Sequence, residues 1–496
     1  MAVIPLLADM HSRWKRVALL ESTLGLLGWD EQVMMPSGGQ SWRGEQFAYL
    51  ASLLHGELVS PGFSETLSEL ERSNLTEPNK LASLKEARRR QSRAVKIPVS
   101  MVEELARVCS QAQQAWALAR KQSDFKLFLP HFEKIIRLKR EEADAVGWQG
   151  HPYNALLDEY EPGMDCLQLD ILFGELQGPL SLFVSQARDL AGNKKSEQPT
   201  GDFPIELQKI FGESAARAVG FRFDAGRLDT STHPFCSGIG SGDCRITSRY
   251  QTDGFLESFF GVLHEAGHGL YEQGLPEGCR AEPWCQSASL GIHESQSRLW
   301  ENLVGRSGAF WEHFYPIARA IFGSSLDCWP LERIQSCVHA VRPGFIRVEA
   351  DETTYNLHIV LRYRIEKGLL DGTIPVRDLP EAWNCLFQEL FGIQVPDDRN
   401  GCLQDIHWSG GGIGYFPTYT LGNLYSAQLM RAAKRDLGDL EEDFRHGNFA
   451  RLLCWLREKV HRVGRTLSAQ EICQRATGAP LSCEPLLEHL KAVALN

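Results

Sequence analysis

The chain has 496 residues, of which 43% are hydrophobic and 12 are tryptophan, so it can bury a large core and has the length of roughly two to four domains. Its 63 acidic and 52 basic side chains give a formal charge of −11. This balance argues against a nucleic-acid-binding surface, because phosphate binding needs concentrated Lys and Arg. The sequence has no uninterrupted apolar run of about 18 residues, so we expect no membrane-spanning helix.

Cysteine usage and the first residues predict a cellular location. Residues 1–16 reach Asp9 and then a basic cluster before an apolar stretch of signal-peptide length accumulates, so we expect no secretion signal. The thirteen cysteines are odd in number and are scattered without C-x-x-C pairs. This pattern favours reduced thiols over a disulfide framework. Both features predict a cytoplasmic protein, and no cysteine looks like a zinc ligand.

The sequence shows no clear domain boundary. Linker-like residues at 191–202 and 396–401 are short enough to be loops, and no repeat or low-complexity block is present. We therefore expect one catalytic unit over residues 1–496, with room for two lobes that flank a cleft. The one basic cluster, residues 85–96, is expected to be a solvated helix face.

The predicted elements are mostly helices. Apolar residues recur at spacings of three and four at 100–122, at 130–147 and again at 353–370. Between residues 220 and 253 the pattern changes to β-like pieces at 221–226 and 243–251, separated by the Gly-, Ser- and Pro-rich segment 231–242. We expect a small antiparallel sheet there, whose edge strand could align an extended peptide. The predicted fold is therefore mainly α with a minor β element.

The most informative motif is His264-Glu265-Ala266-Gly267-His268, which places two imidazoles four residues apart with a carboxylate beside the first. Apolar residues precede it at helical spacing, so the motif sits in mid-helix and both imidazoles lie on one face. Two neutral histidines can then coordinate a zinc ion while Glu265 takes a proton from water activated by the metal. Gly267 and Gly269 weaken a helix, so they invite a reason such as the close approach of another backbone or of substrate.

A hydrolytic zinc site needs a third protein ligand, and Glu294 is the best candidate. It lies in residues 291–303, which predict a second amphipathic helix that could pack against the first and that would place Arg298 on the same face as Glu294. Glu272 is a weaker candidate, because one helix face cannot easily supply three ligands around a tetrahedron. His293 would point about a quarter turn away from Glu294, so a role in orienting a ligand suits it better.

Several strings together resemble the carboxypeptidase Taq family of zinc-type metallocarboxypeptidases, also called thermostable carboxypeptidase 1. Beside the HEAGH motif these strings follow the family's order and approximate spacing over nearly the whole chain. They are WDEQVMMP at 29–36, LLDEYEPGM at 156–164, HPF at 233–235, DCRIT at 243–247, HESQSR at 293–298, IRVEADE at 346–352 and GCLQDIHW at 401–408.

The resemblance implies that His264, His268 and Glu294 bind one divalent metal ion per subunit and that Glu265 is the general base. Zinc is the first choice, and cobalt or manganese also suit these ligands. The family is similar in fold to helical, deep-cleft peptidases with an HExxH motif, such as neurolysin. The deep cleft of such peptidases implies that the substrates are peptides. Members of the carboxypeptidase Taq family typically form homodimers, so the resemblance also implies a homodimer.

Two further residues resemble the histidine and tyrosine that stabilise the oxyanion in related helical metallopeptidases. They are His407 in DIHW and Tyr415 in GGIGYFPTYTLG, where the glycines permit a mobile loop. The alternative interpretation is a buried structural histidine and a packed aromatic side chain.

An enzyme that acts at the carboxyl end of a peptide must bind a free carboxylate, and the planar fork of arginine suits this task. Arg347 is the first choice and Arg245 the second, although Arg245 could equally form a structural pair with Asp243 on the same strand face. Nearby carboxylates could pair with these arginines or meet basic substrate side chains. The predicted substrate-binding group comprises Arg347, Arg245, Asp243, Thr247, Asp351 and Glu352.

The leading hypothesis is a metallocarboxypeptidase that releases single residues from the carboxyl end of peptides. An oligoendopeptidase or dipeptidyl carboxypeptidase built on the same site is the enzymatic alternative, and the length of the released fragments would distinguish it. A noncatalytic peptide-binding protein is the alternative from another class, but such a protein would not need the ligands and the base together.

Overall fold

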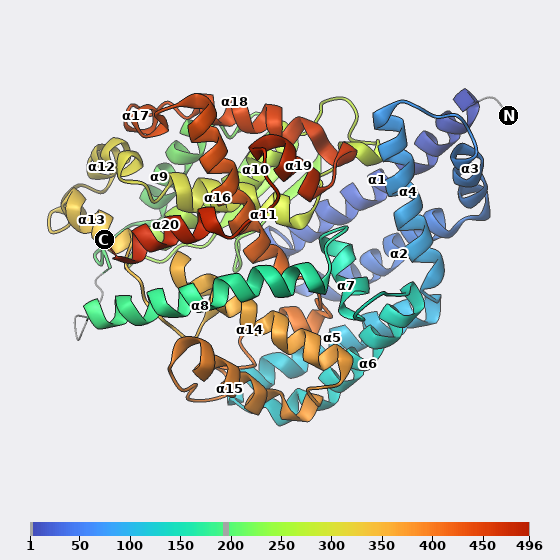
Figure 1. The fold of residues 1–496 in the computed structure, drawn as a ribbon, viewed down its shortest axis with the longest axis horizontal. Helices are drawn as coiled ribbons and strands as arrows, with labels where there is room; N and C mark the ends of the chain where they lie inside the picture. The colour runs from blue at the N-terminus through green and yellow to red at the C-terminus, as the bar shows by residue number, and fades with distance from the viewer. Residues whose placement is uncertain (1–2, 192–197, 496) are drawn as a thin grey trace.

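Helices dominate the computed structural model of the protein, which describes residues 3–191 and 198–495 (Figure 1). The amino-terminal group comprises α1 (Val3–Val33), α2 (Gln40–Val59), α3 (Pro61–Glu71) and α4 (Pro78–Lys96). Next come α5 (Val99–Gln122), α6 (Leu129–Val146), α7 (Tyr153–Tyr160), α8 (Cys166–Ala191) and α9 (Ile205–Ala218). The predicted helices at 100–122 and 130–147 are thus confirmed as α5 and α6. Half of the predicted loop at 191–202, residues 192–197, lies outside the described residues.

The sheet and the carboxyl-terminal helices follow. The strands are β1 (Gly226–Thr230), β2 (Cys236–Gly240) and β3 (Asp243–Ser248), and the next helices are α10 (Leu256–Gly274), α11 (Leu290–Arg298), α12 (Gly308–Phe322) and α13 (Leu331–Val338). The chain continues with α14 (Glu352–Asp371), α15 (Leu379–Phe391), α16 (Pro417–Leu437), α17 (Leu440–Arg445), α18 (Ala450–Lys459), α19 (Ala469–Thr477) and α20 (Glu484–Leu495). The mainly α fold is confirmed. Within the described ranges, no helix is both long and apolar enough to cross a bilayer.

The sheet is mixed, not purely antiparallel as expected. β3 is the central strand, with β2 antiparallel on one side and β1 parallel on the other. The predicted strand at 221–226 is wrong except at its last residue, because residues 221–225 lie outside the sheet and only Gly226 belongs to β1. The Phe221 ring packs over Gly226 and Gly269. The glycine-rich segment 231–242, expected to be only a connection, contains β2. Its Gly238 lies directly against the Glu272 side chain, where a larger residue would not fit.

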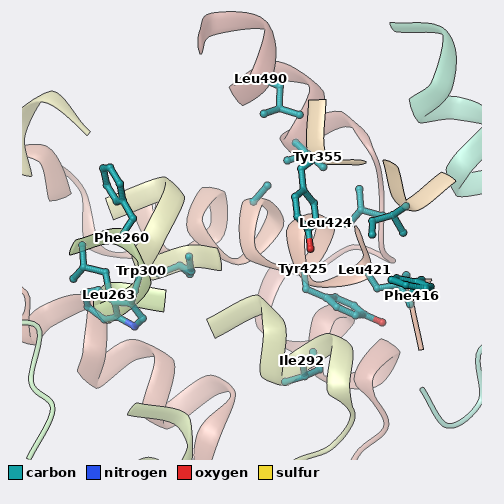
Figure 2. Close-up of a cluster of buried hydrophobic side chains, with 14 of the residues drawn as sticks. Phe260, Leu263, Ile292, Trp300, Tyr355, Phe416, Leu421, Leu424, Tyr425 and Leu490 are labelled. Atoms are coloured by element: carbon teal, nitrogen blue, oxygen red, sulfur yellow. The ribbon is translucent and has the colours of Figure 1, made fainter. Parts of the chain in front are cut away.

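The buried hydrophobic residues form two clusters. The larger one spans α5 to α20, and Figure 2 shows a part of it in which side chains of α10, α11, α14, α16 and α20 meet. The smaller cluster belongs to α1–α4, where Trp14, Phe63 and Leu67 are fully buried. These helices lie at one end of the molecule (Figure 1). The organisation as one unit over 1–496 stays a prediction.

The basic segment 85–96 joins these two clusters, so the prediction of a solvated face is wrong. Arg88 forms an ion pair with Glu71 of α3, and Arg90 forms one with Glu21 of α1. Arg93 pairs with carboxylates of both α6 and α7. These arginines of α4 are therefore half-buried in ion pairs with neighbouring helices.

A disulfide between Cys279 and Cys285 lies in the connection from α10 to α11. The expectation of reduced thiols is wrong for this pair. The two cysteines are six positions apart in the sequence, so the bridge closes only a small loop, and this spacing did not resemble a disulfide framework.

Helix α11 is packed closely on two sides, and this packing places the site. An ideal Cβ on Gly267 of α10 would lie 2.6 Å from the carbonyl oxygen of Gln296 and from Cα of Ser297, both on α11. On the opposite side, a Cβ on Gly422 of α16 would lie 2.5 Å from Cγ of Glu294. The three helices lie together in the middle of Figure 1. The prediction that Gly267 allows another backbone to approach is confirmed, and Gly269 is covered by Phe221.

We expect Gly267→Ala to lower the melting temperature, because the added methyl group meets backbone atoms of α11 that cannot move without separating the helices. The cost should be about 1–3 kcal/mol, as for other overpacked cores. Calorimetry would measure it. Gly56→Ala is the matched control, because Gly56 is an exposed glycine of α2 with open space around it. This control should stabilise the protein by up to about 1 kcal/mol. Equal melting temperatures of the two variants would contradict the packing argument.

Candidate metal centre

Three side chains from two helices converge on one point. The Nε2 atoms of His264 and His268 on α10 lie 3.7 Å and 3.3 Å from Oε2 of Glu294 on α11. The three ligand atoms lie within 4.8 Å of one another, and no other such group of His, Cys, Asp or Glu occurs in the described ranges. Two imidazoles and one carboxylate are the donors of hydrolytic zinc sites with an open position for water. The residues present therefore fit one divalent metal ion.

Both imidazoles are oriented through Nδ1. Nδ1 of His264 lies 2.8 Å from Oε2 of Glu301, and Nδ1 of His268 lies 3.0 Å from the carbonyl oxygen of His293. These acceptors favour the tautomer with the proton on Nδ1, which leaves the lone pair of Nε2 free for a metal ion. Sequence reasoning missed Glu301, although its position seven residues after Glu294 places both on one helix face. It lies in a π-helical turn, Leu299–Val304, that continues α11.

Buried charges surround the ligands. Nε of Arg298 lies 2.6 Å from Oε1 of Glu294. Although burial opposes ionisation, Arg298 and His264 hold the pKa of Glu294 well below its usual range, so it stays a carboxylate. Burial lowers the pKa of His268 to about 4, whereas Glu294 and Glu301 outweigh burial and raise that of His264. The carboxylate form of Glu294 and the neutral ring of His268 are the forms in which these side chains can bind a metal cation.

Glu265 lies beside the ligands and is 5% exposed. Among the described residues, no side chain forms a hydrogen bond or ion pair with its carboxylate. Burial raises its pKa to about 7, against the attraction of His264. A carboxylate with this pKa and no competing partner is suited to accept and return a proton near neutral pH.

The two competing ligand candidates contact each other instead. Oε1 of Glu272 lies 3.0 Å from Nε2 of His293, and Oε2 lies 2.9 Å from Arg280. The His293 ring packs against His268, with 2.6 Å between their Nδ1 atoms. This geometry favours Glu294 over Glu272 as third ligand, with His293 supporting His268.

The loop before α16 brings His407 and Tyr415 together, with their ring centroids 5.5 Å apart. Burial and the nearby charge of Glu294 raise the pKa of Tyr415 to about 12, so its hydroxyl remains a donor beside the metal ligands. Burial and then Arg347 lower the pKa of His407 to about 4. Nε2 of His407 lies 3.3 Å from the hydroxyl of Tyr419, which sequence reasoning missed although it lies one helical turn after Tyr415.

Arg347 is buried in a group with more positive than negative charge. Its Nε lies 3.0 Å from Oδ1 of Asp405, and its Nη1 donates to the hydroxyl of Tyr355. Arg362 donates to the other oxygen of Asp405. Two guanidinium groups thus share one carboxylate, and this leaves a charge that an incoming carboxylate could balance.

The three predicted substrate-binding residues of β3, Asp243, Arg245 and Thr247, contact other parts of the protein. Arg245 forms a two-pronged pair with Asp243, at 2.8 Å for each bond, and stacks over the ring of Trp29. The hydroxyl of Thr247 lies 2.7 Å from that of Ser231 and accepts a hydrogen bond from the backbone amide of Phe235. It therefore shapes the turn that carries the HPF string.

The last two predicted residues, Asp351 and Glu352, lie at the start of α14. Asp351 caps this helix by accepting the amides of Thr353 and Thr354. Oε2 of Glu352 lies 2.8 Å from Nε2 of His489. In the described residues neither carboxylate pairs with Arg347 or Arg245, so the structure does not bring these two together with the arginines.

Comparisons with known proteins identify the family of this chain. The chain is 41% identical over 491 residues to thermostable carboxypeptidase 1 of Thermus thermophilus, and the match covers 96% of each chain. It is 36% identical to carboxypeptidase 1 of Bacillus subtilis, covering 96% of this chain and 95% of the relative. The crystal structure of an M32 carboxypeptidase from Deinococcus radiodurans superposes with a TM-score of 0.95 at 36% identity, over 99% of both chains. The family described as carboxypeptidase Taq (M32) metallopeptidase matches residues 9–493. The chain therefore belongs to the carboxypeptidase Taq (M32) family of metallopeptidases.

Proposed function

We propose that this metallocarboxypeptidase hydrolyses the last peptide bond of peptides and releases single carboxy-terminal residues. The convergence of His264, His268 and Glu294 on one point, with the unpaired carboxylate of Glu265 beside them, carries this proposal. A metal ion, when bound, supplies a Lewis acid that polarises the scissile carbonyl and makes water more acidic.

The side chains around the metal site divide the remaining tasks. Glu265 accepts the proton of the attacking water and delivers it to the leaving amine. We assign donation to the oxyanion to the hydroxyl of Tyr415 and the ring of His407, whose rings lie 5.5 Å apart. Arg347 holds the free carboxylate of the substrate, which supplies the negative charge that its group with Arg362 and Asp405 lacks. Arg245 and Asp243 are a second candidate pair on β3, and the fully buried Thr247 supports the turn beside them.

We further propose one zinc ion per subunit, with cobalt or manganese as the alternatives that suit the same donors. Family membership supports a homodimer. Most of the described cysteines lie outside the disulfide, and this predominance supports a cytoplasmic location. Asp351 and Glu352 act in substrate binding only if a bound peptide recruits them from their present partners.

An oligoendopeptidase or a dipeptidyl carboxypeptidase would use the same metal site. The surplus positive charge at Arg347 favours the carboxypeptidase, because an internal bond presents no carboxylate to it. A noncatalytic peptide-binding protein would leave the unpaired Glu265 without a task.

Glu265→Gln should abolish cleavage and preserve metal binding, because the amide cannot accept a proton. Loss of a general base costs about 100- to 10,000-fold in rate. The metal-loaded proteins would be incubated with an amino-blocked peptide, and the products followed by mass spectrometry. Glu257→Gln on the exposed first turn of the same helix is the control. Internal cuts by the wild-type protein would favour an endopeptidase, and no cleavage with any of the three metals would favour a binding protein.

Glu301→Gln should weaken metal binding by about 10- to 100-fold, because the amide no longer fixes the His264 ring as a carboxylate does. Competition with a chelator would measure the affinity. Glu257→Gln again serves as control and should bind the metal like wild type. Unchanged affinity in Glu301→Gln would remove the orienting role assigned to Glu301.

Arg347→Gln should lower kcat/KM for a peptide with a free carboxyl end by about 10- to 100-fold, since a charged hydrogen bond contributes about 1.5–3 kcal/mol. Cleavage of the same peptide with an amidated end, already poor, should change little. Arg245→Gln, made in parallel, should leave the preference for the free acid intact. The opposite pattern would move carboxylate binding to Arg245.

A further inference from the structure

A buried carboxylate on α14 holds both ends of the loop that carries His407 and Tyr415. Glu366 is fully buried, and its two oxygens accept three hydrogen bonds. Oε1 accepts Nε1 of Trp408 at 2.8 Å, and Oε2 accepts the amide of Gly414 at 3.1 Å. The third donor is the hydroxyl of Tyr153 on α7, 2.7 Å from Oε2.

The two loop donors are immediate neighbours of the proposed catalytic residues. Trp408 follows His407, and Gly414 precedes Tyr415. One carboxylate therefore fixes the chain one residue away from each of them. The turn between them is closed by a bond of 2.8 Å from the amide of Gly412 to the carbonyl of His407.

The rest of the loop is packed to match. Gly414 has a φ of +94°, and a Cβ there would lie 2.9 Å from the carbonyl carbon of Leu156 in α7. Trp408 stacks on Phe132 of α6, with ring centroids 5.5 Å apart, and Ile413 is fully buried. Gly414 thus permits both the positive φ of the turn and the close packing of the loop against α7.

The carboxylate of Glu366 has no cationic partner in the described part of the chain. Burial raises its pKa to about 7, while its three donors act in the opposite direction. Burying such a group is costly unless it is hydrogen-bonded, and here two of its three bonds go to the loop.

We propose that Glu366 is the positioning residue of the carboxypeptidase site, which acts by holding the 407–415 loop so that His407 and Tyr415 face the metal ligands. This inference rests on the proposed function of these two residues. Glu366 touches neither substrate nor metal in this role.

Glu366→Gln tests this with almost no change of shape. An amide has one oxygen, and Trp408 and Gly414 donate to different oxygens, so its NH₂ group must face one of the two N–H donors in either orientation. We expect kcat to fall by about 10- to 100-fold, the range for a displaced catalytic group, with KM and metal content unchanged. Hydrogen–deuterium exchange of the peptide spanning 407–416 should rise.

Tyr153→Phe is the matched control, because it removes a bond to the same Glu366 oxygen and leaves both loop bonds. It should keep kcat within about twofold of wild type, since a single buried hydrogen bond outside the loop affects stability more than geometry. In a double-mutant cycle, Glu366→Gln combined with Tyr415→Phe should lower kcat by much less than the product of the two single effects. The reason is that Glu366 acts by positioning the hydroxyl that Tyr415→Phe already removes. Should Glu366→Gln fail to fold, Trp408→Phe removes the donor beside His407 and is expected to give the same pattern.

The outcomes are separable from those of the proposed function. An unchanged kcat in Glu366→Gln, an equal loss in Tyr153→Phe, or additive effects in the cycle would overturn the positioning role. If the wild-type protein cleaves no peptide, the proposed function fails, and the exchange measurement still decides whether Glu366 orders the loop. Unchanged exchange in Glu366→Gln would then overturn the inference.

Discussion

The contact on which the site depends is the close packing of α11 between α10 and α16. Gly267 lets the backbone of α11 approach the helix that carries both histidines, and Gly422 makes room for the Glu294 side chain on the other side. A methyl group on Gly267 would overlap the α11 backbone, and one on Gly422 would overlap the Glu294 side chain, so either would displace the carboxylate. Protein interiors are packed too densely to absorb such a change locally.

Around this contact the structure balances buried charges in two groups. Glu294 and Glu301 are stabilised as carboxylates by Arg298, which also pairs with Glu301 at 3.3 Å. Arg306 pairs with Glu301 as well, at 3.2 Å, so two guanidinium groups balance the two carboxylates. In the second group Arg347 and Arg362 share Asp405, and the surplus is positive where a substrate carboxylate would bind. The first group is thus balanced, and the second has a surplus positive charge that a substrate carboxylate would balance.

Sequence reasoning succeeded where the signal is local and periodic, and failed where a distant partner decides. The helices α5, α6, α10, α11 and α14 follow from apolar spacing along a single segment. The basic residues of α4 look identical to a solvated face, and only the carboxylates of α1, α3, α6 and α7 make them internal. Likewise β2 lies in a glycine-rich segment whose strand conformation depends on packing against Glu272 and pairing with β3.

By itself the sequence determined the mainly α class, the three ligand candidates and the candidate general base, because an HExxH motif places its two histidines on one face of a helix. Only the tertiary structure decided that Glu301 contacts Nδ1 of His264, that Arg245 is already paired with Asp243, and that Glu366 bonds both ends of the 407–415 loop. These contacts join residues far apart in the chain or on different elements. Periodicity reports which face a residue occupies, whereas the identity of the group opposite that face depends on how the helices pack.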